Sequence, residues 1–112
     1  MNDSLPSTAV LRVSRVTFDP TLYDTVAALD KKTSEYLVPA IKQLPGLIYW
    51  FAGVSPNGSF VQMSIWDSKE HAMQMDSLKE MAVTARAEFT EAGVSFDPEH
   101  ATIVNYPMTW SI

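Results

Sequence analysis

Residues 47–66 have the sequence LIYWFAGVSPNGSFVQMSIW, and this stretch decides the fold class. Residues 47–54 form a continuous apolar and aromatic run, and residues 59–66 alternate between two faces. Between them, residues 55–58 (SPNG) combine the residue types that favour a tight turn. The lengths and boundaries of both runs favour strands over helices, so the sequence predicts a β-hairpin.

Two runs outside the hairpin also favour strands. Residues 9–18 (AVLRVSRVTF) and residues 101–110 (ATIVNYPMTW) are rich in β-branched and apolar side chains. Pro107 cannot donate a hydrogen bond to a neighbouring strand. We therefore expect the last strand to lie at an edge, to carry a bulge or to leave its sheet at that residue.

The segments between the strands are predicted to be helical. Residues 19–20 (DP) are typical of a helix start, and apolar residues follow at helical spacing as far as Leu44. Pro39 lies inside this segment and predicts a kink or two abutting helices. A second helix is expected from Asp67, where an Asp-containing relative of the capping box begins, to Ala92.

The resulting element order is β-α-β-β-α-β. This order predicts an α+β, ferredoxin-like antiparallel sheet with both helices on one face. The other face should then be polar, yet both faces of all four strands carry large apolar side chains. Soluble monomers seldom expose an apolar patch above a few hundred Å². We therefore expect a homodimer in which two sheets pack face to face.

Composition narrows the class of protein. The 112 residues, 46% of them apolar, predict one globular domain over residues 1–112, with a loose segment at residues 1–8. Cysteine is absent, which excludes disulfides and zinc–thiolate sites. The net charge of −5 argues against nucleic acid as a partner. No apolar run is long enough for a membrane span and no signal peptide is evident, so we expect a cytoplasmic protein without membrane partners.

The acidity and the aromatic content each allow two interpretations. The whole negative net charge comes from residues 57–112, as either a solvated helix face or a docking surface. Aromatic residues 49–51 and Trp66, with methionines near Trp66 in sequence, suit a pocket for a flat apolar molecule. They also suit plain core and dimer packing. The polar residues that interrupt this apolar setting are Ser14, Gln62, Ser64 and His71, with Arg12 and Arg86 further out.

Catalytic motifs are sparse. The chain has only two histidines, His71 and His100, at a spacing that does not predict a metal site, so none is expected. Neither a nucleophile elbow nor a glycine-rich phosphate loop is present. His71 lies near the start of the second helix, which suits a general base or a hydrogen-bond acceptor as well as an ordinary surface histidine.

Three short stretches resemble the antibiotic biosynthesis monooxygenase family of dimeric α/β-barrel proteins. These stretches are residues 19–20 (DP), residues 44–46 (LPG) and residues 66–72 (WDSKEHA). The resemblance implies a homodimer. Some family members oxidise aromatic polyketides or quinols with O2 and need neither a metal nor an organic cofactor, whereas others degrade haem. The positions that carry the haem site in that branch resemble Ser14, Met75 and about Ala85 here, and none keeps the family residue. The resemblance therefore disfavours haem degradation.

The resemblance implies a cofactor-independent monooxygenase that acts on a small apolar or aromatic molecule of the quinol type. Trp66 would form a wall of the pocket, and His71 or a water held by Ser14 would assist deprotonation of the substrate. The other expected substrate-binding residues are Gln62, Ser64 and Arg86. The alternative is a non-catalytic small-molecule-binding or accessory dimeric α/β-barrel protein, because the sequence lacks a strong acid–base pair.

Overall fold

The computed structural model describes residues 5–110, apart from the side chains of residues 79 and 80. Residues 5–8 contain no strand or helix, and the first four residues of the segment predicted to be loose lie outside the described part of the chain. No helix of the described residues is both long and apolar enough to cross a membrane.

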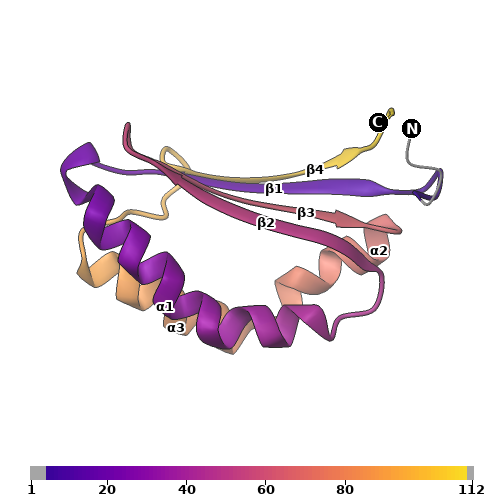
Figure 1. The fold of residues 1–112 in the computed structure, drawn as a ribbon, viewed down its shortest axis with the longest axis horizontal. Helices are drawn as coiled ribbons and strands as arrows, with labels where there is room; N and C mark the ends of the chain where they lie inside the picture. The colour runs from indigo at the N-terminus through magenta and orange to yellow at the C-terminus, as the bar shows by residue number, and fades with distance from the viewer. Residues whose placement is uncertain (1–4, 111–112) are drawn as a thin grey trace.

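Four antiparallel strands form one sheet in the order β2-β3-β1-β4, which is the ferredoxin-like arrangement predicted from the sequence (Figure 1). The strands are β1 (Val10–Thr17), β2 (Leu47–Ser55), β3 (Ser59–Trp66) and β4 (Ala101–Pro107). β4 lies at an edge and ends at Pro107, in agreement with the expectation for a proline that cannot donate to a ladder.

The hairpin of β2 and β3 closes at the predicted turn. Gly58 adopts a positive φ of 95°, and its N–H donates to the carbonyl of Ser55 at 3.0 Å. The carbonyl of Gly58 in turn accepts a hydrogen bond from the N–H of Phe18 at 2.9 Å, which ties the turn to the end of β1. The hairpin is therefore fixed both by its own turn chemistry and by the neighbouring strand.

The first helical segment consists of the short helix η1 (Pro20–Leu22) and helix α1 (Tyr23–Lys42). The Asp19 carboxylate accepts the N–H of Thr21 at 2.9 Å, so the predicted cap is confirmed. Pro39 lies inside one continuous α1, so the alternative of two abutting helices is wrong. Packing against the sheet keeps the helix intact across the proline, as tertiary contacts often override local propensity.

The second helical segment is broken, whereas the sequence predicted one helix from Asp67 to Ala92. It comprises α2 (Lys69–Ala72), η2 (Met73–Ser77) and α3 (Lys79–Glu91). The break falls where Ser77 Oγ donates to the carbonyl of Gln74 at 2.6 Å, because short polar side chains compete with helical hydrogen bonds. The cap is Ser68 rather than Asp67: its Oγ accepts the N–H of His71.

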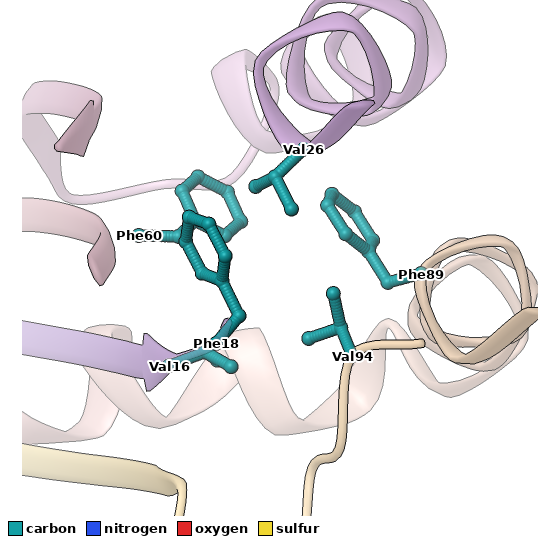
Figure 2. Close-up of a cluster of buried hydrophobic side chains, with 6 residues drawn as sticks. All are labelled: Val16, Phe18, Val26, Phe60, Phe89 and Val94. Carbon is teal, nitrogen blue, oxygen red and sulfur yellow. The ribbon is translucent and has the colours of Figure 1, made fainter. Parts of the chain in front are cut away.

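Helices α1 and α3 cover one face of the sheet (Figure 1). The larger core cluster lies between these layers and contains Val16, Phe18, Val26, Phe60, Phe89 and Val94 (Figure 2). The rings of Phe60 and Phe89 stack with centroids 5.5 Å apart, which joins β3 to α3. This core cluster therefore packs one end of the sheet against both long helices.

Within residues 5–110, no helix covers the opposite face of the sheet (Figure 1). Strand register places on this open sheet face Leu11, Val13, Tyr49, Phe51, Val61, Met63, Ile65, Val104 and Tyr106. Phe51 is 51% exposed and Tyr106 is 48% exposed. The sequence-based expectation of a large apolar face without a cover in the monomer is therefore confirmed.

Candidate functional site

A cavity of about 400 Å³ lies between the covered face of the sheet and helices α1 and α3, with η2 at one side. We call it the sheet–helix cavity. Its volume falls within the range of roughly 300–1,000 Å³ that is typical of small-molecule sites. Most of its lining is apolar, contributed by side chains such as Leu37, Ile41 and Phe89, with a small set of polar groups among them. This combination suits a flat apolar ligand that polar groups orient.

Two polar side chains enter the cavity from adjacent strands. Ser14 of β1 and Gln62 of β3 are paired residues of the antiparallel ladder, and both line the cavity. Side chains of paired residues lie on the same face of a sheet, about 5 Å apart at Cβ. The pair therefore offers a hydroxyl and an amide side by side to one ligand. Both residues were predicted from the sequence as site residues.

Arg86 reaches the cavity from α3. Its guanidinium carbon lies 5.6 Å from the centre of the Phe96 ring, and both residues line the cavity. This cation–π contact holds the guanidinium against an aromatic wall. The structure therefore brings together three of the predicted site residues, Ser14, Gln62 and Arg86, from three different elements.

Trp66 and Ser64 lie behind the cavity wall rather than in it. Both side chains are buried, and the indole Nε1–H of Trp66 donates to Ser64 Oγ at 2.8 Å. Trp66 packs in a second apolar cluster with Val10 and Ala72. Met75 contacts this cluster and also lines the cavity, so Trp66 supports the wall that Met75 presents.

His71 lies outside the cavity lining. Its Nδ1 is 2.5 Å from Asp67 Oδ1, and a Cβ placed on Gly46 would overlap this imidazole. Asp67 and Gly46 also meet through the backbone, where the N–H of Asp67 donates to the carbonyl of Gly46 at 2.9 Å. The structure thus places His71 at the junction of β3, α2 and the loop that precedes β2, and its catalytic role stays a prediction.

Sequence reasoning missed one charged group of the cavity and underrated another. Arg12 is only 6% exposed, lines the cavity, and donates from Nη2 to Asp76 Oδ1 at 2.8 Å. Arg12 was visible in the sequence as one of two arginines within an otherwise largely apolar strand. Asp76 carried no such signal, because its contact with Arg12 depends on how η2 lies against β1.

The positions that resemble the haem site, Ser14, Met75 and Ala85, all line the cavity, and none of the described lining residues is a histidine.

The second histidine belongs to a separate surface cluster. Asp97, Glu99 and His100 present possible metal-ligand atoms within 4.8 Å of one another, and all three are exposed. His100 Nδ1 lies 2.8 Å from Asp97 Oδ1, and this hydrogen bond, followed by one from Ser95, lowers the pKa of Asp97. These contacts account for the cluster as a hydrogen-bonded turn before β4.

No protein-family model matches the chain, and no curated protein sequence matches it. Solved structures do match it over nearly its whole length. The protein NE2512 of unknown function from Nitrosomonas europaea is 16% identical, with a TM-score of 0.64, over 95% of this chain and 94% of its own. A monooxygenase from the gene ActVA-Orf6 of Streptomyces coelicolor, solved with the ligand nanaomycin D, is 15% identical, with a TM-score of 0.64, over 95% of this chain and 91% of its own.

SnoaB, a cofactor-independent oxygenase from Streptomyces nogalater, is 14% identical, with a TM-score of 0.53, over 94% of this chain and 95% of its own. At such identities the likeness establishes the fold alone. The chain therefore has the fold of these proteins and of structures described as antibiotic biosynthesis monooxygenases from Deinococcus radiodurans and Chloroflexus aurantiacus, so the resemblance inferred from the sequence is confirmed at the level of the fold.

Proposed function

We propose that the protein is a homodimeric, cofactor-independent monooxygenase that oxidises a small aromatic or quinol-type molecule in the sheet–helix cavity. The observation that carries this proposal is the cavity itself, a largely apolar space of about 400 Å³ with Ser14, Gln62 and Arg86 at its surface. The fold supports it, because solved neighbours of this fold include a monooxygenase bound to nanaomycin D and a cofactor-independent oxygenase.

The residues of the cavity take distinct parts in this proposal. The amide of Gln62 binds a carbonyl or hydroxyl oxygen of the ring system, and Ser14 beside it binds a second oxygen or a water that assists deprotonation. Arg86, held against Phe96, attracts negative charge that develops on the substrate. Trp66 keeps the wall behind Met75 rigid.

The reaction balances without an external reductant. A deprotonated quinol is rich enough in electrons to reduce O2 itself. One oxygen atom enters the ring, and the other leaves as water with two hydrogens from the substrate, so a quinol becomes a hydroxyquinone. The protein contributes orientation of the substrate and transfer of its proton.

The homodimer forms through the open sheet face. Phe51, Tyr49 and Tyr106 are each close to half exposed in the single chain, and the rings of Tyr49 and Phe51 stack with centroids 5.9 Å apart. A second copy would cover this patch with an identical one, as two-fold symmetry requires. A single domain over residues 1–112 and a cytoplasmic location complete the proposal.

Oxygen consumption tests the proposed activity. The purified protein is incubated with a panel of quinols and anthrones in the presence of a chelator, and O2 uptake is compared with the uncatalysed rate. We expect saturable uptake and, with ¹⁸O2, one labelled oxygen atom in the product. Gln62→Leu should lower kcat/KM at least about tenfold, since a lost hydrogen bond to a charged group is worth roughly 1.5–3 kcal/mol. Gln43→Leu, at the exposed position that follows α1, is the matched control.

A second candidate, a non-catalytic small-molecule-binding or accessory protein, is favoured by one observation. His71, the expected base, lies outside the cavity, and the described lining residues include no other imidazole. A thermal-shift screen separates the two functions. Ligands that raise the melting temperature, without O2 uptake above the uncatalysed rate, would favour binding alone and count against the monooxygenase.

A further inference from the structure

An ion pair between Arg12 and Asp76 lies in the wall of the sheet–helix cavity. Arg12 Nη2 donates to Asp76 Oδ1 at 2.8 Å, and both side chains line the cavity. The Arg12 side chain is 7% exposed, whereas that of Asp76 is 54% exposed. Asp76 is the one carboxylate among the described residues of the cavity lining. Among the described lining residues, Arg12 and Asp76 are therefore the only two opposite charges in contact.

Neighbouring residues fix the positions of both Arg12 and Asp76. Asn105 of β4 lies beside Arg12 on the same face of the sheet, with its Oδ1 3.4 Å from Arg12 Nη1. The turn that carries Asp76 is anchored by Gln74, whose amide donates to the carbonyls of Pro45 at 2.8 Å and His71 at 2.7 Å. The pair is thus prepared before a ligand arrives, which is the condition for electrostatic stabilisation without reorganisation.

The pair has capacity left for a ligand. A carboxylate accepts hydrogen bonds at both oxygens, and a guanidinium carries five N–H donors. Among the described residues no side chain donates to Asp76 Oδ2, and only Nη1 and Nη2 of Arg12 are engaged. One ligand oxygen placed at the pair can therefore donate its hydrogen to Asp76 and accept a hydrogen bond from Arg12.

We propose that Asp76 is the general base of the cavity and that Arg12 stabilises the oxyanion it generates on a phenolic or enolic ligand. This inference rests on the proposed function and names its proton acceptor. The O–H bond of the ligand breaks, the proton binds Asp76 Oδ2, and the electron pair stays on the ligand oxygen. Arg12 exchanges its carboxylate partner for the new oxyanion, so the total charge of ligand, Asp76 and Arg12 is zero before and after the step.

The arrangement also selects the substrate class. An acidic hydroxyl satisfies both members of the pair, whereas the methyl ether of the same ring has no proton for Asp76. A site built around a ligand hydroxyl discriminates strongly against an analogue that lacks it, because its polar groups are then left unpaired. We therefore expect the cavity to prefer 2-naphthol over 2-methoxynaphthalene, although both rings fill the same apolar space.

The ionisation of a bound probe tests the pair independently of turnover. 2-Naphthol absorbs at different wavelengths in its neutral and ionised forms, so the pKa of the bound probe follows from an absorbance titration. Asp76→Asn leaves Arg12 as the only charge of the pair and should lower this pKa by about 1 unit or more relative to wild type. Arg12→Gln leaves Asp76 alone and should raise it by a similar amount. Asp24→Asn, at an exposed position of α1, is the matched control and should leave the pKa of the bound probe unchanged.

The opposite signs show that the hydroxyl of the probe lies at both charges, which a pair that only stabilises the fold away from the ligand would not produce. Shifts in the same direction, equal values in all variants, or wild-type protein that binds no 2-naphthol would overturn the proposal. If Arg12→Gln fails to fold, the rate of O2 uptake by Asp76→Asn provides a second test. The O2 uptake of Asp76→Asn should be lost at neutral pH and recover as the pH rises through the pKa of the free substrate, because solution then supplies the anion. If no substrate consumes O2, the proposed function fails, while the absorbance titration still decides whether a ligand hydroxyl lies between Asp76 and Arg12.

Discussion

Trp66 and Ser64 are two residues apart on one face of β3, and the indole Nε1–H of Trp66 donates to Ser64 Oγ at 2.8 Å. Trp66 is 0% exposed and Ser64 is 1% exposed. A buried indole needs an acceptor, and Ser64 supplies it from within the same strand. The bond explains how a tryptophan with a polar edge fits a cluster otherwise formed by Val10 and Ala72.

Ser64→Ala should destabilise the fold. The substitution leaves the indole N–H without its acceptor in a buried place, which costs about 1–3 kcal/mol. Urea denaturation followed by tryptophan fluorescence measures the loss. Ser7→Ala, at an exposed position before β1, is the control and should have almost no effect. Equal stability of Ser64→Ala and wild type would show that the bond contributes nothing.

Gly46→Ala should destabilise the junction of β3 and α2. Gly46 has a φ of 86°, a conformation that costs other residues roughly 1–2 kcal/mol. The new methyl group would also overlap His71, so the penalty should shrink when His71→Ala is added. Thermal unfolding of the single and double variants measures this coupling. Gly53→Ala, where a Cβ meets nothing within 4 Å, is the control at equal protein concentration. Strict additivity would contradict the predicted clash.

Ionised Glu88 should stabilise the fold, and this contribution to the free energy of unfolding should be lost at acidic pH. Hydrogen bonds from Lys32 of α1 at 2.5 Å, and then from Tyr36 at 3.0 Å, lower the pKa of Glu88 below its ordinary value of 4.5. A carboxylate with a lowered folded-state pKa stabilises the fold above its unfolded pKa and loses that contribution as the pH falls through the folded-state value.

Chemical denaturation between pH 6 and pH 3 checks this sign with Glu88→Gln. Its stability deficit relative to wild type should be largest near pH 6 and shrink as the pH falls below about 4.5, because protonation removes the charge in wild type as well. Glu35→Gln, on the exposed side of α1, controls for the loss of a surface carboxylate. A deficit that grows towards pH 3 would refute the assignment.

Phe51→Glu should convert the proposed homodimer to a monomer. The ring is 51% exposed on the open sheet face, and a two-fold interface would bury two new carboxylates at once. Light scattering after size exclusion at micromolar concentration gives the mass. Met81→Glu, at an exposed apolar position on α3 in the helix layer, should leave the dimer intact. A wild-type monomer, folded and soluble, would refute the dimer.

Local patterns were sufficient for most of the fold. The run at residues 59–66 gave the bounds of β3 as the structure has them, because alternation and a Pro-Asn-Gly turn act within a few residues. Two expectations about helix continuity failed for opposite reasons: the alternative of two abutting helices at Pro39, and the unbroken second helix. Tertiary packing carried α1 through Pro39, and local hydrogen bonds of Gln74 and Ser77 broke a helix that the apolar stripe predicted as continuous.

The candidate site was predicted only in part. Ser14, Gln62 and Arg86 were identified as polar residues in apolar surroundings, and all three line the cavity. Ser64 showed the same pattern but bonds to Trp66 behind the wall. A strand pattern shows which face a side chain occupies, and it does not show whether that face meets a cavity or solid core at that point.

The sequence alone therefore determined the strands, the hairpin, the element order and the apolar character of both sheet faces, since these follow from periodicity and turn chemistry. Tertiary structure alone decided which groups meet. Arg12 and Asp76 are 64 positions apart, and their contact joins β1 to η2. A contact between distant residues depends on how whole elements pack, and no local pattern contains that information.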